Sequence, residues 1–230
     1  TLTSGTGSIF GFLVARQAYD AAVMAPMFVA MSFAFGTAVF LIALLTIARA
    51  TGRPVDAAVI GRQSKLLSVF VAVVLYFVVT FHVTNLYAAE HGEIVRFLLL
   101  DGDPYVKLFW VGQIAVGSFL PLVLLWAPRL SRSRAVCYTA ACLVLLGGLA
   151  QIYVIIIGGQ AYPLLLFPGY DVSSPFFDGA IGQYSGTLNE YLLGIGGIAL
   201  AILVVTVAVR VLPFVPEKLP AAVAADHAAS

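Results

Sequence analysis

Long apolar stretches alternate with shorter polar segments along this sequence. The apolar stretches cover residues 23–47, 66–87, 106–126, 135–157 and 191–212. A helix needs about 20 mostly apolar residues to cross a bilayer, so the pattern predicts an all-α, polytopic transmembrane helix bundle of about five spans over residues 23–216. Residues 9–15 are apolar but too few to span. We interpret residues 1–22 as an outer or interfacial segment, or as the end of a helix that begins earlier, and residues 217–230 as a flexible cytoplasmic tail.

The composition agrees with a membrane protein and argues against other classes. Hydrophobic residues make up 61% of the chain and charged residues 10%, and the mean hydropathy is +1.02. Soluble domains carry roughly a quarter charged residues. The net charge of +1 provides no basic face for nucleic acid. Cys137 and Cys142 lie in an apolar run without metal-ligand spacing, which is typical of buried thiols.

Charge alternates between the connecting segments. Basic residues prevail between spans one and two, between spans three and four, and after span five, at Arg49, Arg53, Arg62, Lys65, Arg129, Arg132, Arg134, Arg210 and Lys218. Acidic residues prevail in the other two connections, at Glu90, Glu93, Asp101, Asp103, Asp171, Asp178 and Glu190. Because basic loops tend to stay in the cytoplasm, the N-terminus is expected outside and the C-terminus in the cytoplasm. The expected location of the chain is the inner (plasma) membrane.

The connection at residues 158–190 is long and rich in glycine, proline and aromatic residues. Connections of this length without periodicity are usually functional or disordered, and the many aromatic residues argue against disorder. We interpret the segment as a folded outer cap, re-entrant or used for docking. The alternative is a solvent loop with aromatic residues at the membrane interface.

Four polar side chains lie within the predicted spans at a similar depth. His82 and Asn85 are three residues apart and share one helix face. The helical rise places His82 roughly 7–8 Å, and Gln113 and Gln151 roughly 9–10 Å, below the outer boundary. They either form hydrogen bonds between helices that fix packing, or line a pocket for a quinone head group. In the second case the pocket binds menaquinone or ubiquinone, and His82 is the proton acceptor. The ring is then positioned by Asn85, Gln113 and Gln151.

Metal chemistry has little support in the sequence. A bis-histidine haem needs two histidines in the membrane, and the spans contain one, His82. Met24, Met27 and Met31 are expected to pack in the core. No metal is expected in this chain, so electrons would be carried by a bound quinone or by another subunit. Glu90 and His91, just beyond span two, are either a proton exit or ordinary interfacial residues.

Several stretches together resemble the NrfD/PsrC family of polysulfide-reductase-type membrane subunits. They include HVTNLY at residues 82–87 and RVLPFVP at 210–216, and the others fall at residues 4–16, 25–36, 108–126 and 152–160. The resemblance corresponds to the C-terminal part of family members. In this sequence Thr3 stands near a position where several relatives have histidine, and Gln113 stands where many have glutamate, so proton transfer at these two positions is in doubt.

The resemblance implies a quinone- or quinol-interacting anchor subunit of a respiratory oxidoreductase complex. Such a subunit passes electrons between the quinone pool and an iron–sulfur ferredoxin-like partner, often with a molybdopterin or other catalytic subunit. Two alternatives are a purely structural membrane anchor without a quinone site and a small transporter. Transporters typically carry charged residues or broken helices at the midplane, and no acid or base lies deep in these spans.

Overall fold

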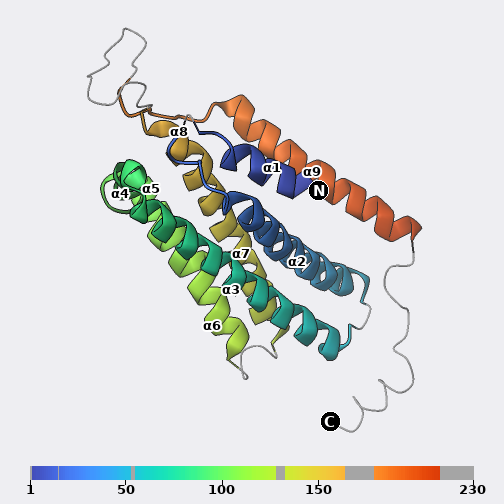
Figure 1. Ribbon diagram of the computed structural model, residues 1–230. Helices are drawn as coiled ribbons and strands as arrows, with labels where there is room; N and C mark the ends of the chain where they lie inside the picture. Colours follow the sequence, from blue (N-terminus) through green and yellow to red (C-terminus); the bar gives the residue numbers. More distant parts are fainter. Residues whose placement is uncertain (1, 15, 53–54, 128–132, 164–178, 213–230) are drawn as a thin grey trace. The chain divides into compact units, whose positions relative to one another are not determined.

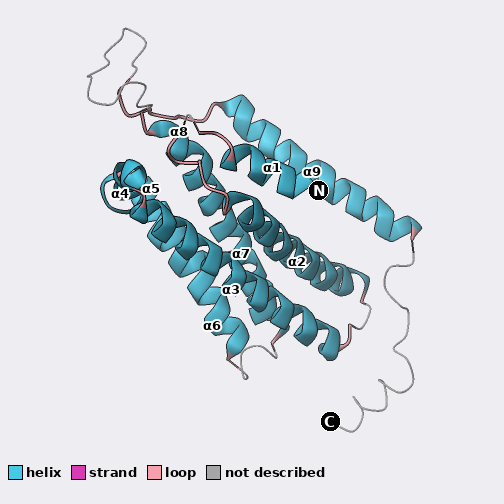
Figure 2. Cartoon of the chain, in the orientation of Figure 1, coloured by secondary structure: helices cyan, strands magenta, loops and turns pink. Residues whose placement is uncertain are grey.

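The computed structural model describes residues 2–14, 16–52, 55–127, 133–163 and 179–212 of the chain (Figure 1). The predicted all-α class is confirmed, because these residues form helices and no strand (Figure 2). The chain divides into two units: Thr1–Leu45 with Ala57–Gly182, called unit 1, and Thr46–Asp56 with Gln183–Ser230, called unit 2.

The prediction of five membrane spans is confirmed. Five described helices are long and apolar enough to cross a bilayer: α2 (Met24–Thr51), α3 (Ala57–Tyr87), Tyr105–Trp126, Arg134–Ala161 and α9 (Leu188–Val211). The third comprises α5 (Tyr105–Lys107), the π-helical segment η3 (Leu108–Phe119) and α6 (Leu120–Trp126). The fourth comprises α7 (Arg134–Tyr153), the π-helical segment η4 (Val154–Gly158) and α8 (Gly159–Ala161).

Short elements precede the first span or follow α3 in unit 1. They are α1 (Leu2–Gly11), η1 (Ala89–His91), α4 (Gly92–Arg96) and the π-helical segment η2 (Phe97–Asp101). The segment at residues 1–22 thus contains a short helix, Leu2–Gly11, which ends within the apolar stretch at residues 9–15. The connection at 158–190 is helical at both ends, in α8 and the start of α9, while residues 164–178 and the predicted tail lie outside the described residues.

Glycine contacts bring the third and fourth spans of unit 1 together. A Cβ atom on Gly147 would lie 2.1 Å from the Cα atom of Gly117, so only glycine allows these two backbones to meet. One turn away, a Cβ atom on Gly112 would lie 2.9 Å from the Ala150 Cβ atom. In a bilayer, where burial of apolar surface does little to drive helix association, such close packing holds helices together.

Larger side chains join α2 to this pair of spans. Met24, Met27 and Met31 are all buried, as expected for core methionines. Phe35 of α2 lies against Gly148, where a Cβ atom would be 2.3 Å from the Phe35 ring. Cys137 is fully buried and accepts a hydrogen bond from Ser64 at 3.2 Å, while Cys142 is half-buried. The core of unit 1 therefore lies among α2, α3 and the third and fourth spans.

Unit 2 contains α9 as its main element. The helix begins with a capping box, in which the Thr187 N–H donates to the Glu190 carboxylate at 2.8 Å. Gly194, Gly196 and Gly197 lie within α9, and small residues permit close approach of membrane helices.

Candidate functional site

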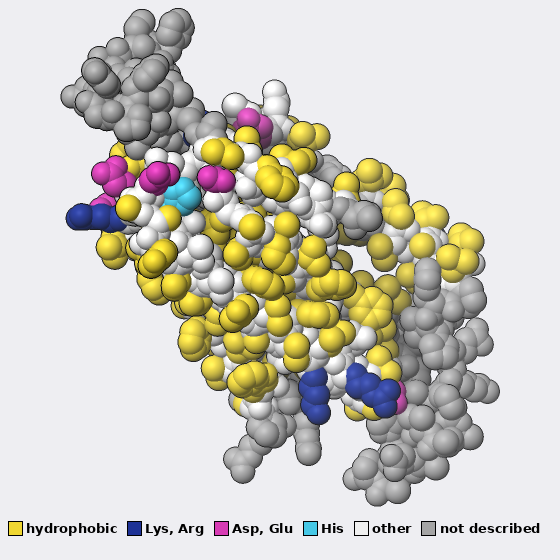
Figure 3. Space-filling view, in the orientation of Figure 1, with side chains coloured by type: hydrophobic (Ala, Val, Ile, Leu, Met, Phe, Trp, Pro, Cys, Tyr) yellow, Lys and Arg dark blue, Asp and Glu magenta, His cyan; other side chains and the backbone are white. Residues whose placement is uncertain are grey.

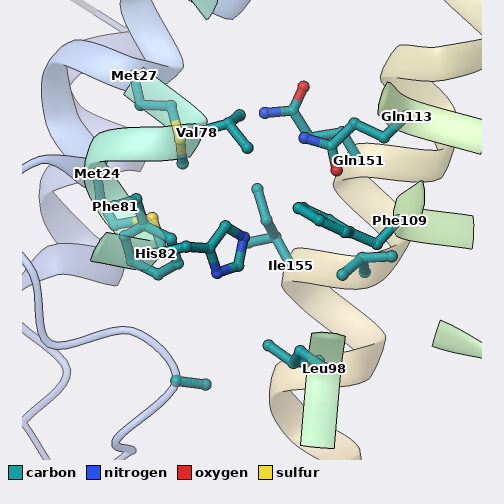
Figure 4. A pocket seen from close by; sticks show the side chains of 12 residues that line it. Met24, Met27, Val78, Phe81, His82, Leu98, Phe109, Gln113, Gln151 and Ile155 are labelled. Carbon is teal, nitrogen blue, oxygen red and sulfur yellow. The ribbon is translucent and has the colours of Figure 1, made fainter. Parts of the chain in front are cut away.

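Three of the four predicted polar residues line one cavity in unit 1. His82 comes from α3, Gln113 from η3 and Gln151 from α7. Figure 4 shows the His82 ring and the two amides directed toward the same space. The rest of the lining is apolar, contributed mainly by Met24, Met27, Val78, Phe81, Leu98, Phe109, Val154 and Ile155.

His82 is held between two aromatic rings. The Phe81 ring centroid lies 5.2 Å away and that of Phe109 lies 4.8 Å away, both in edge-to-face orientation. The Nδ1 atom of His82 is shielded from solvent and is the one such buried side-chain atom without a hydrogen-bond partner among the described residues. A buried polar atom without a partner costs about 1–3 kcal/mol. An unpaired nitrogen at a cavity wall is therefore a candidate for ligand binding.

The two glutamines differ in how they are held. Gln151 is buried, and its side-chain N–H donates to the Met31 sulfur at 3.3 Å. Gln113 is also buried, and its backbone carbonyl accepts a hydrogen bond from the Ser118 hydroxyl at 3.0 Å. An amide carries two donors and an acceptor, and a thioether is a weak acceptor. Both side chains therefore keep hydrogen-bonding capacity for a ligand.

The structure places Asn85 away from the cavity lining. Asn85 is buried, and its side-chain oxygen lies 3.3 Å from the Nδ1 atom of His91. This contact joins the last turn of α3 to η1. Asn85 and His82 lie on neighbouring parts of the α3 surface, but the contact with His91 accounts for Asn85 without a ligand.

Three π-helical segments contribute to the cavity, and the pattern of apolar residues does not reveal them. Leu98 comes from η2, Phe109 and Gln113 from η3, and Val154 and Ile155 from η4. π-helical turns are rare and occur frequently at functional sites. The apolar pattern predicts where a span lies but does not distinguish i→i+5 from i→i+4 hydrogen bonding.

The cavity lies near the acidic end of unit 1, which we define by Glu90, Glu93, Asp101 and Asp103. Arg96 pairs with Asp101 at 2.8 Å, and Lys107 pairs with Asp103 at 2.6 Å. The described basic residues Arg62, Lys65 and Arg134 belong to the opposite end, where α3 and α7 begin. Figure 3 shows most of the visible acidic side chains toward one end, with basic side chains beside them, and further basic side chains toward the other end.

Two hydrogen-bonded side chains connect segments at the acidic end. The Tyr162 hydroxyl donates to Glu93 at 3.0 Å. Burial raises the pKa of Tyr162 to about 12, and the hydrogen bond to Glu93 adds to this. Arg16 donates to the backbone oxygen of Gln160 at 2.9 Å. The segment before α2 and the connection after α3 are thus each tied to the end of the fourth span.

The cavity is closed in this structure. Its volume is about 20 Å³, which accommodates about one water molecule, whereas small-molecule pockets typically measure roughly 300–1,000 Å³. Aromatic and methionine side chains fill much of the surrounding space, and methionine adapts easily to a change in shape. A ring-sized ligand therefore requires these side chains to move.

Comparison with known proteins identifies the family. Residues 1–163 match the family described as "Polysulphide reductase, NrfD". The chain is 28% identical to the "Hdr-like menaquinol oxidoreductase integral membrane subunit" of Archaeoglobus fulgidus, over 94% of this chain and 55% of that protein. It is 29% identical to a putative dimethyl sulfoxide reductase membrane subunit of Halobacterium salinarum, over 98% of this chain and 53% of that protein.

A third relative is a selenate reductase subunit of Mesobacillus selenatarsenatis, 26% identical over 91% of this chain and 47% of that protein. The chain thus spans about half the length of the curated relatives it matches. The family match covers most of unit 1, including every residue that lines the cavity. Together with the five apolar helices, it shows that this chain is an integral membrane protein and belongs to the NrfD family of polysulphide-reductase-type membrane subunits.

Proposed function

We propose that this chain is a quinol-binding membrane subunit of a respiratory oxidoreductase complex. The observation that supports this most is the cavity lined by His82, Gln113 and Gln151, together with the buried His82 Nδ1 atom that has no hydrogen-bond partner among the described residues. A quinol ring carries two oxygen atoms that each need a hydrogen-bond partner. The three side chains offer these partners in otherwise apolar surroundings, which is the usual composition of a small-molecule site.

The chemistry assigns a different role to each side chain. Oxidation of a quinol releases two electrons and two protons. Among the residues that line the cavity, His82 carries the imidazole, and it accepts a proton from a quinol hydroxyl. Gln113 and Gln151 do not titrate, so they orient the ring through their amides. The electrons pass to an iron–sulfur partner subunit, and the second proton needs an acceptor besides His82.

The names of the relatives support one choice of quinol and of partners. One of them is named as a subunit of a menaquinol oxidoreductase, so menaquinol is the substrate we favour over ubiquinol. All three are named as subunits of oxidoreductases, which supports an iron–sulfur subunit and a catalytic subunit, such as a molybdopterin protein, as partners. The positive-inside rule supports the acidic end facing outward from the inner membrane.

The test is quinol oxidation by the intact complex with single substitutions in this chain. His82→Ala should lower kcat on the order of 100-fold, since a positioned acid or base contributes about 10²–10⁴-fold. Gln113→Leu should raise KM about fivefold, because a lost hydrogen bond is worth about 1 kcal/mol. Gln63→Leu in α3 is the matched control, because Gln63 does not line this cavity.

Co-purification of the partner subunits measures assembly in each variant. Normal quinol turnover in a fully assembled complex that carries His82→Ala and Gln113→Leu together would contradict the proposal. That result would favour a purely structural anchor. Loss of assembly with normal activity in the remaining complex would have the same meaning.

A further inference from the structure

Each π-helical segment around the cavity has a backbone carbonyl that accepts a hydrogen bond from a side chain. In η2, Leu99 accepts from the Trp110 indole at 2.9 Å. In η3, Gln113 accepts from Ser118 at 3.0 Å, and in η4, Ile156 accepts from the Tyr19 hydroxyl at 2.9 Å. The Leu99 carbonyl cannot accept the usual i+5 backbone hydrogen bond of a π-helix, because the residue at i+5 is Pro104, which has no N–H.

Tyr19 is the donor that comes from outside the spans. Its side chain is 2% exposed, and its ring packs on Gly159, where a Cβ atom would lie 2.8 Å from the ring. Burial raises the pKa of Tyr19, so the hydroxyl remains a donor. Arg16, three residues earlier, donates to the Gln160 carbonyl. The segment that contains Arg16 and Tyr19 therefore holds the end of the fourth span at two points.

The carbonyl that Tyr19 binds belongs to the residue directly after two cavity residues. Val154 and Ile155 line the cavity, and Gln151 lies one turn earlier. A change from π to α hydrogen bonding shifts the register by one residue, about 100° of rotation in a helix of 3.6 residues per turn. The contact with Gly117 holds Gly147 in place, so the rotation would displace Val154, Ile155 and the residues that follow them.

We propose that Tyr19 is a positioning residue for the quinol site: its hydrogen bond to the Ile156 carbonyl holds η4 in the π register that directs Val154 and Ile155 at the cavity. The expected effect of Tyr19 on quinol binding rests on the proposed function, whereas its expected effect on η4 does not. Ala18, next to Tyr19, also lines the cavity, so the same segment forms part of the wall that it stabilises.

The test compares Tyr19→Phe with Tyr162→Phe in the intact complex. Both substitutions remove one hydrogen-bonded hydroxyl at the same end, but Tyr162 donates to the Glu93 side chain and not to a π-helical carbonyl. The first measurement is hydrogen–deuterium exchange of peptides that cover residues 154–161. The second is the steady-state oxidation of menadiol, the reduced form of the menaquinone head group.

In Tyr19→Phe, exchange at 154–161 should become at least tenfold faster, and KM for menadiol should rise three- to tenfold while kcat stays within twofold. Tyr162→Phe should change neither. Unchanged exchange would overturn the inference, and so would faster exchange with an unchanged KM. If the wild-type complex does not oxidise menadiol, the proposed function fails and this role with it, while the exchange data still report whether Tyr19 holds η4.

Discussion

His82 and Asn85 lie three residues apart in α3, yet they have different partners. His82 faces the cavity, and Asn85 contacts His91. The spacing correctly indicated neighbouring positions on one helix, but it could not show that the chain turns back after Tyr87 and brings His91 to Asn85. The depth estimate for His82, Gln113 and Gln151 depended only on helical rise and on the ends of the spans. It therefore succeeded in grouping residues from three helices.

Burial, together with the hydrogen bond to Glu93, should make Tyr162 titrate at high pH. The ordinary pKa of tyrosine is about 10, and that of Tyr162 is raised to about 12. The folded state therefore favours the neutral phenol. Its contribution to stability is fully present below about pH 10 and is lost as pH rises through about 12.

The ultraviolet difference spectrum between wild type and Tyr162→Phe isolates the phenolate absorbance of this residue. We expect its midpoint to lie near pH 12 as long as the chain stays folded. A midpoint near pH 10 would show that neither burial nor the contact with Glu93 protects the phenol in solution.

At the scale of elements, the apolar pattern predicted the spans well and their internal geometry poorly. The predicted start of the second span was residue 66, but α3 begins at Ala57, because a helix continues through polar residues such as Arg62 and Lys65 once it leaves the apolar layer. The π-helical segments have no counterpart in the pattern. Pro104 was the one sign of a π-helical segment in the sequence. It has no N–H to donate to the Leu99 carbonyl, which instead accepts a hydrogen bond from Trp110.

Close packing of the third and fourth spans should make Gly147 intolerant of even a methyl group. An added Cβ atom would meet the Gly117 backbone at 2.1 Å, and overpacking of this kind typically costs about 1–3 kcal/mol. Gly147→Ala should therefore lower the melting temperature of the chain in detergent by several degrees.

Gly36→Ala is the matched control for that substitution. Gly36 also lies inside a span, in α2, but no described atom beyond the neighbouring backbone of its own helix lies within 4 Å of a Cβ atom built there. Because alanine favours helix over glycine by about 1 kcal/mol, this variant should be as stable as wild type or slightly more so. Equal destabilisation by both substitutions would contradict the packing described for Gly147.

At the scale of the whole molecule, charge provides the expected orientation. The acidic end should face outward and the end with Arg62, Lys65 and Arg134 should face the cytoplasm. Single cysteines introduced as Glu90→Cys and Arg62→Cys test this, because both positions are exposed. A membrane-impermeant maleimide should label the first in intact cells and the second only after permeabilisation. The reverse pattern would place the cavity near the cytoplasmic surface.

The central claim is that His82, Gln113 and Gln151 bind the quinol ring. The most direct measurement is a cryo-EM structure of the intact complex with a saturating menaquinone analogue. We expect density for the ring between these three side chains, with the cavity enlarged from about 20 Å³ and a ring nitrogen of His82 within hydrogen-bond distance of a quinol oxygen. A ring bound elsewhere, with this cavity still closed, would contradict the account.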